Sequence, residues 1–132
     1  MDTRTQWLNA FKTLSFGNEL TTTLAEEKFQ NQTLRPILKW QNELLLEVFK
    51  NYAVKQKSMF FSLSPEKKET YIENAIQKDI KLRNTLKGIV IGLFSLEEFQ
   101  EYKKNTSNLN KRIMNLIIER LKSQVMILQE GL

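Results

Sequence analysis

The stretch Leu34–Tyr52, LRPILKWQNELLLEVFKNY, carries the clearest structural signal in the chain. Residues of one stripe recur at i, i+3, i+4 and i+7, which is the spacing of one face of an α-helix. Pro36 is tolerated in a first helical turn and Thr33 can cap it, so the pattern predicts a long core-facing helix that begins at Leu34. The stripe consists of Leu34, Ile37, Leu38, Gln41, Leu44, Leu45, Val48, Phe49 and Tyr52.

Two shorter helices are predicted upstream of this stretch. Thr23 and Glu26 have the spacing of a capping box, which favours a short helix from about Leu24 to Gln30. An amino-terminal helix is predicted around residues 5–14. It would bury Trp7, Leu8, Phe11 and Leu14.

A second long helix is predicted downstream, from Pro65 to about Lys87. Ser64-Pro65-Glu66 combines an N-cap, a proline at the first helical position and an acid in the first turn. Either Gly88 or Gly92 can end this helix, and the sequence leaves the choice open. Its stripe is Tyr71 or Ile72, Ala75, Ile76, Asp79, Ile80, Arg83, Leu86 and Val90. Because charges are seldom buried alone, we expect Asp79 and Arg83 to form an ion pair at the edge of the core, either with each other or with a residue of another helix.

Two more helices complete the predicted set. Ser95 and Glu98 form a second capping box, which predicts a short helix ending near Lys104. Residues 105–108 are expected to form a turn, and a final long helix begins at Leu109. Its stripe is Ile113, Leu116, Ile117, Arg120, Leu121, Gln124, Val125 and Leu128.

Length and composition agree with this pattern. The chain has 132 residues, a size typical of one domain, so residues 1–132 are expected to form a single core. It contains only 4 Gly and 2 Pro, too little turn material for a many-stranded sheet. The predicted fold is all-α, an irregular helical bundle of about five to six helices, three long and two to three short.

Two residue types are absent from the chain, and their absence limits the kinds of catalytic and metal sites that it can form. The chain has neither cysteine nor histidine, which removes disulfides, the commonest transition-metal ligands and the commonest general base. We therefore predict no catalytic residue, no metal and no cofactor. The amino terminus lacks the pattern of a secretory signal and no apolar run is long enough to span a bilayer. A cytoplasmic location without a membrane segment is expected.

Arginines are the first candidates for binding. Arg83 and Arg120 lie in otherwise apolar stripes, and guanidinium forks bind carboxylates or phosphates bidentately. One functional interpretation is a binding domain or an enzyme with an arginine-lined pocket for an anionic small metabolite. It would use Arg35, Arg83, Arg112 and Arg120. The chain carries a net charge of +5, but its basic residues are dispersed among acids, which disfavours nucleic-acid binding.

Aromatic residues suggest an interface. Trp40 lies off the main stripe of its helix, and Met59-Phe60-Phe61 occupies a loop that is expected to be polar. Large apolar patches are rare on monomers, so these residues indicate self-association, such as a homodimer, or an unidentified protein partner. The alternative is that they fold back onto the core. A non-enzymatic helical protein that acts through such a surface is the leading functional prediction, and the arginine pocket is the alternative.

Four segments also carry a resemblance. They are EKFQNQTLRPILK (27–39), IENAIQKDI (72–80), LKGIVIGLF (86–94) and NKRIMNL (110–116). Together they resemble a family of small, uncharacterised helical bacterial proteins, some of which carry the label glyoxalase. The resemblance implies a shared helical fold. It supplies no catalytic residue, because glyoxalase metal sites use histidine and this chain has none.

Overall fold

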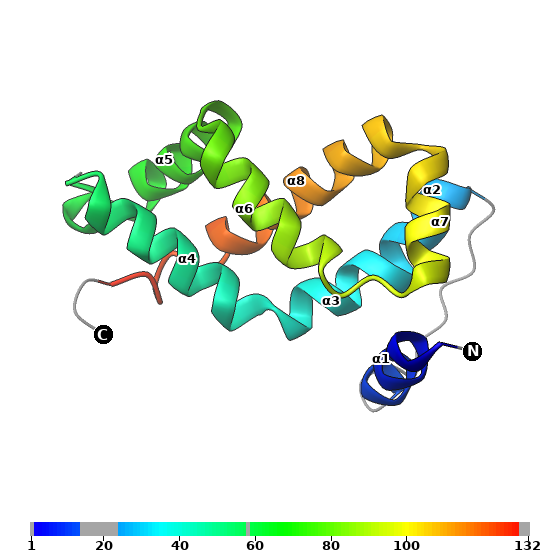
Figure 1. Ribbon diagram of the computed structural model, residues 1–132. Coiled ribbons are helices and arrows are strands. Elements are labelled where there is room, and N and C mark those ends of the chain that lie inside the picture. Colours follow the sequence, from blue (N-terminus) through cyan, green and yellow to red (C-terminus); the bar gives the residue numbers. More distant parts are fainter. Residues whose placement is uncertain (1, 14–23, 58, 130–132) are drawn as a thin grey trace.

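The chain folds into α-helices joined by short turns, and the part of it that the structure describes contains no β-strand (Figure 1). The structure is a computed structural model that describes residues 2–13, 24–57 and 59–129. Its elements are α1 (Thr3–Thr13), α2 (Ala25–Phe29), the π-helical segment η1 (Gln30–Leu34), α3 (Arg35–Trp40), α4 (Asn42–Lys55), the 3₁₀ turn η2 (Phe60–Ser62), α5 (Pro65–Lys78), α6 (Ile80–Ile91), α7 (Leu96–Lys104) and α8 (Thr106–Lys122). Since α2, η1 and α3 are continuous, these residues form seven helices. The all-α prediction is confirmed, with more breaks between helices than the sequence pattern indicated.

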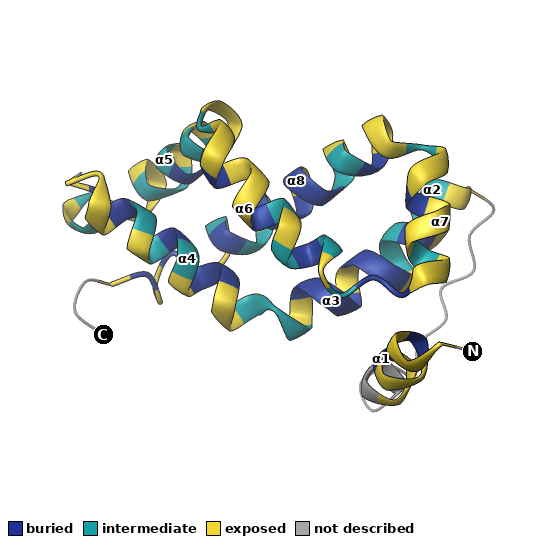
Figure 2. Ribbon diagram, viewed as in Figure 1, coloured by how far each residue is buried: buried dark blue, intermediate teal, exposed yellow. Residues whose placement is uncertain are grey.

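Helix α8 lies at the centre of the core. It packs against α3, α5, α6 and α7. The apolar residues of its predicted stripe are buried, including Ile113, Ile117 and Leu121, whereas Arg120 and Gln124 are half-buried. The helix ends at Lys122, so the predicted stripe residues within 124–128 lie in the segment that follows it. The helix begins at Thr106 and not at Leu109, because Asn105 alone makes the turn from α7. Figure 2 shows the buried residues of the bundle on the faces that the helices turn toward one another.

The helix predicted to begin at Leu34 begins earlier. Residues 25–40 are helical throughout, and Thr33 is buried and donates its hydroxyl hydrogen to Glu98 Oε2 at 3.1 Å, so it is no N-cap. Pro36 lacks an N–H, and its ring would clash with the carbonyl four residues earlier in a regular α-helix. The wider π-helical turn directly before Pro36 relieves that clash, which explains why the helix continues through it.

This helix also breaks where the sequence predicts continuity. Gln41 has φ −93° and ψ 4°, and α3 meets α4 at an angle there (Figure 1). The Gln41 side chain makes a hydrogen bond at the same point, where its Nε2 donates to Ile89 O at 3.1 Å. The break resets the helical phase. Leu46 is therefore buried in α4, whereas Leu44, expected in the core, is 48% exposed.

The helix predicted from Pro65 divides in two at Asp79. Its start is confirmed, with the Ser64 side chain accepting from Lys67 N at 3.4 Å. Asp79 has extended backbone and caps α6 by accepting from Leu82 N at 3.0 Å. Helix α6 then continues past Gly88 and ends at Ile91.

The capping role of Asp79 changes its own contacts and the exposure of the residues that follow it. Its carboxylate faces the amino terminus of α6 and accepts a hydrogen bond from the Tyr52 hydroxyl. Within the described residues Asp79 and Arg83 form no ion pair with each other or with a residue of another helix, so the predicted ion pair is wrong. Ile80, expected in the stripe, is 70% exposed because the break shifts the phase of α6.

The Tyr52 hydroxyl makes stability depend on pH. Burial, followed by the negative charge and the hydrogen bond of Asp79, raises the pKa of Tyr52 to about 12. An unfolded tyrosine has a pKa of about 10, so the unfolded chain loses this proton first. The contribution of Tyr52 is thus fully present below about pH 10 and is lost as the pH rises toward about 12. We expect the wild type to lose stability across this window more steeply than Tyr52→Phe, as measured by urea unfolding at each pH. Equal slopes would contradict this assignment.

Helices α1 and α7 close one end of the bundle. The capping box of α7 is confirmed, since Glu98 N donates to Ser95 Oγ at 3.1 Å and Ser95 N to Glu98 Oε1 at 2.8 Å. Arg4 of α1 donates to Phe94 O at 2.9 Å and to Gly92 O, beyond the carboxyl end of α6. Leu8 is fully buried as predicted, but Trp7 is 58% exposed. The predictions made for Leu14, Thr23 and the Phe11 side chain fall outside the described residues. Within the described ranges, no helix has both the length and the apolar character needed to cross a bilayer.

Candidate functional site

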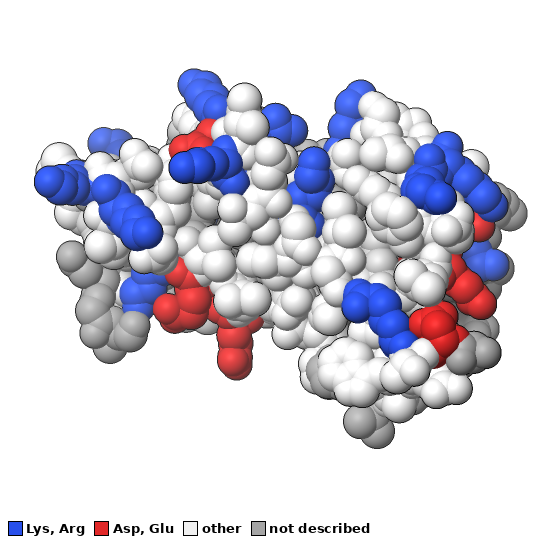
Figure 3. All heavy atoms as spheres, viewed as in Figure 1, with Lys and Arg blue, Asp and Glu red and all other residues white. Residues whose placement is uncertain are grey.

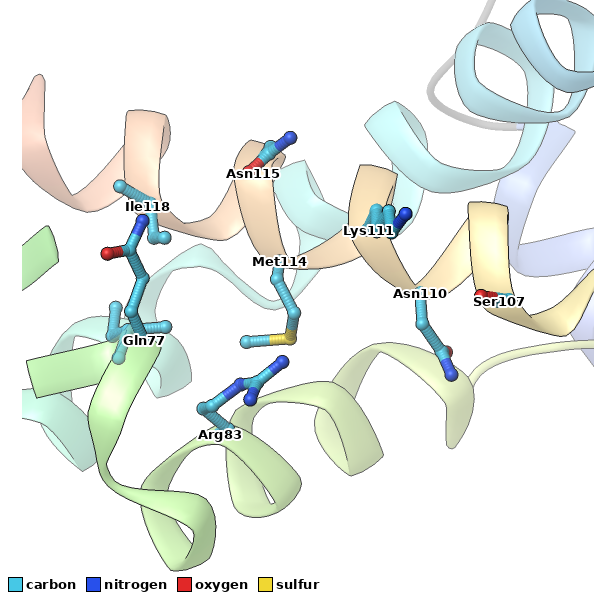
Figure 4. A pocket seen from close by; sticks show the side chains of 9 residues that line it. Gln77, Arg83, Ser107, Asn110, Lys111, Met114, Asn115 and Ile118 are labelled. Carbon is cyan, nitrogen blue, oxygen red and sulfur yellow. The ribbon is translucent and has the colours of Figure 1, made fainter. Parts of the chain in front are cut away.

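Helix α8 separates the four candidate arginines into two groups. Arg35 lines two adjoining grooves on one flank of α8, one shared with Arg120 and the other with Arg112. Arg83 lines a third groove, where α5 and α6 face α8 (Figure 4). This groove shares Lys111 and Asn115 with the groove beside Arg112 but no residue with the groove of Arg35 and Arg120. The structure therefore brings three of the predicted arginines together and leaves Arg83 apart.

The groove between α3 and α8 contains the pair Arg35 and Arg120. Its volume is about 340 Å³, and it is lined by Arg35, Leu38, Leu116, Glu119, Arg120 and Ser123. Arg120 is half-buried, and burial, followed by the charge of Arg35, lowers its pKa. Neither arginine pairs with a carboxylate in the described part of the chain. Glu119 lines the same groove but forms no ion pair with either arginine in the described residues. Two neighbouring cations that are not ion-paired are unfavourable on their own and are typical of an anion site.

Amide side chains hold both guanidinium groups in place. Asn42 and Gln124 exchange two hydrogen bonds, of 2.7 and 2.8 Å, and Arg120 Nη1 donates to Asn42 Oδ1 at 3.4 Å. Arg35 Nε donates to Asn31 Oδ1 at 3.1 Å. Each guanidinium therefore has one edge fixed and the remaining N–H groups left for a ligand. The sequence pattern missed Asn31 and Asn42. The polar Gln124 within an apolar stripe was the one signal of this network.

Arg112 has a structural role. It forms an ion pair with Glu26 at 3.3 Å and donates to Gln30 Oε1 at 2.9 Å, which links α8 to α2 and η1. Glu26 also accepts from Asn105 and Asn108, and these two bonds, with a smaller effect of Arg112, lower its pKa. The groove of about 570 Å³ beside Arg112 therefore contains a cation that is already neutralised.

The predicted interface residues do not form one patch. Phe60 is fully buried, with ring centroids 5.5 Å from Phe49 and 5.1 Å from Tyr71. Its assignment to a surface is therefore wrong, and the alternative that it folds back onto the core is confirmed for this residue. Met59 is 77% exposed, and Phe61 and Trp40 are half-buried. Trp40 ends α3, so the 14 residues of α4, about 21 Å of helix, separate it from Met59 and Phe61. Self-association stays a prediction, without a continuous surface to carry it.

Charge on the visible face is divided among small patches. Figure 3 shows Lys and Arg as separate groups with a wide uncharged area between them. No three acidic side chains of the described residues come together in a way that could hold a metal ion. A binding site on this molecule must therefore be argued from individual grooves.

Comparison with known proteins adds no assignment. No protein-family model, no curated protein and no solved structure matches this chain. The resemblance to small helical bacterial proteins stays a prediction, and the functional argument proceeds from the grooves around α8.

Proposed function

We propose that this protein binds a small phosphorylated molecule in the groove that Arg35 and Arg120 share. One observation carries the proposal: two guanidinium groups, one of them half-buried, line the same groove without a carboxylate partner in the described residues. A bound anion would neutralise both charges and replace the water that Arg120 has lost.

The shape and charge of the groove favour a phosphate monoester. A phosphate monoester dianion carries twice the charge of a carboxylate and has three terminal oxygen atoms to accept from two guanidinium forks, whereas a carboxylate has two. Glu119 lines the same groove, and its ionised carboxylate can only accept hydrogen bonds. Hydroxyl groups next to the phosphate would satisfy it. The preferred ligand class is therefore a phosphate monoester that carries hydroxyl groups.

The residues that line the groove favour ligand binding over catalysis. Ser123 is the one hydroxyl side chain that lines it, and that hydroxyl already donates its hydrogen to Arg120 O at 2.7 Å. The chain contains no histidine to act as a base. We therefore propose a binding protein, with recognition of the anion as its activity.

Titration calorimetry with inorganic phosphate and glycerol phosphate tests this function. Arg35→Gln and Arg120→Gln should each weaken binding about ten-fold or more, since each removes charged hydrogen bonds of about 1.5–3 kcal/mol. Lys39→Gln, an exposed site in α3, makes the same change in net charge and should leave the affinity within about two-fold. Equal losses in all three variants would show that net charge alone attracts phosphate.

Asn31→Asp provides a second test without removing an arginine. The new carboxylate would stand where Asn31 Oδ1 now accepts from Arg35 Nε, at 3.1 Å. An Asp four residues before an Arg stabilises a helix by about 0.2–0.5 kcal/mol, so folding should be preserved. Because the ion pair neutralises Arg35, we expect phosphate affinity to fall about ten-fold, by roughly 1.4 kcal/mol. Unchanged affinity would contradict the role of Arg35.

A further inference from the structure

The groove that α5 and α6 form with α8 differs from its neighbours because no carboxylate lines it. It has a volume of about 510 Å³ and is lined by Ile76, Gln77, Arg83, Ser107, Asn110, Lys111, Met114, Asn115 and Ile118. Figure 4 shows Arg83 of α6 and Met114 of α8 extending into the same space from opposite walls. The size lies within the range of about 300–1,000 Å³ that is usual for small-molecule sites.

The positive charge of this groove has a structural cause. In a continuous helix Asp79 would lie four residues before Arg83 and could pair with it. The break at Asp79 turns its carboxylate to Leu82 N and the Tyr52 hydroxyl instead. Neither Arg83 nor Lys111 forms an ion pair in the described part of the chain, so two cations are left on the rim.

The floor of the groove is apolar and its walls carry amides. Ile76, Met114 and Ile118 are between 0% and 7% exposed, so the base of the groove belongs to the hydrophobic core. Asn110 accepts from the Tyr102 hydroxyl through Oδ1 at 2.6 Å, which leaves its Nδ2 hydrogens for a ligand. The groove thus combines hydrogen-bond donors and positive charge at the rim with apolar side chains beneath.

We propose that this groove binds a small amphipathic carboxylate, whose carboxylate lies against Arg83 and Lys111 and whose apolar body covers Met114 and Ile118. The Arg83 fork matches a carboxylate bidentately, and the apolar floor offers an acyl chain the burial that a bare phosphate would not use. This site is independent of the phosphate groove, because it uses other residues and another face of α8.

Methyl NMR of the methionines tests the proposal with octanoate as the probe. The chain has four Met residues, and with ¹³C-methyl labelling the Met114 signal should shift on titration, as identified by its loss in Met114→Leu. Met59 and Met126 are 77% and 71% exposed, so their signals should stay in place and serve as controls. Shifts of the exposed methyls with Met114 unmoved would place octanoate elsewhere and overturn the proposal.

Binding affinities then test the contributions of the ligand's carboxylate and of its acyl chain separately. Arg83→Gln should weaken octanoate binding about ten-fold, whereas Lys81→Gln, an exposed site on the same helix, should change it less than about two-fold. Each buried methylene contributes about four-fold, so butanoate should bind at least about ten-fold more weakly than octanoate. Arg35→Gln should keep full octanoate affinity, which makes failure here distinguishable from failure of the phosphate groove. Equal binding of butanoate and octanoate, or no effect of Arg83→Gln, would contradict the proposal.

Discussion

The Phe60→Ala variant should be about 3–5 kcal/mol less stable than the wild type, the cost of removing a fully buried phenylalanine. Phe60 has no exposed surface, and its ring packs between Phe49 and Tyr71 with the Lys68 ammonium 5.5 Å from its centroid. The cavity left by alanine cannot close easily, because α4 and α5 hold its walls. Urea unfolding followed by circular dichroism measures the loss.

Met59→Ala is the matched control for this loss. Met59 precedes Phe60 in the chain and is 77% exposed, so its truncation should change stability by less than about 0.5 kcal/mol. The sequence alone led us to place both side chains in the same interface, with folding back onto the core as the alternative. Similar small losses at the two positions, together with a shift of a dimer toward monomer, would restore that interpretation.

Local signals in the sequence predicted helix starts well. Ser64-Pro65 and the Ser95 capping box act through atoms within one helical turn, so they need no knowledge of the remaining chain. The stripe of α8 was also predictable, because a helix that packs on four others must bury one continuous face.

Single-residue breaks between helices were not predictable from periodicity. Gln41 and Asp79 each interrupt a pattern that continues on both sides, and a periodic window averages over one residue. The consequence is large, because each break rotates the following helix. Leu44 and Ile80 are exposed for that reason. Aspartate is a strong N-cap, so Asp79 could have been interpreted as the start of a new helix. Its position within the helical stripe favoured a continuous helix instead.

The candidate site was predicted by residue type and not by geometry. Arg120 was recognisable as a charge within an apolar stripe, but its neighbour Arg35 comes from another helix and another part of the chain. Only the packing of α3 on α8 brings them together. The same limit explains Arg112, whose partner Glu26 lies on α2.

Ile80→Pro should leave stability within about 1 kcal/mol of the wild type, although proline inside a helix costs about 3 kcal/mol or more. Ile80 is the first residue of α6 and is 70% exposed, a position where the N–H is unused and proline is favoured. Asp79 before it has φ −89° and ψ 106°, an extended backbone conformation close to the one that a following proline favours. If residues 65–87 formed one helix, the same substitution would be severely destabilising.

Thr85→Pro is the matched comparison for Ile80→Pro. Thr85 is also exposed, but it lies within α6, so proline there removes a backbone hydrogen bond and should cost about 3 kcal/mol or more. Thermal and urea unfolding of both variants measure the difference. A large loss in Ile80→Pro as well would mean that α5 continues into α6. Asp79 would then lie on a helix face beside Arg83, and the free charge that the amphipathic carboxylate needs would be paired.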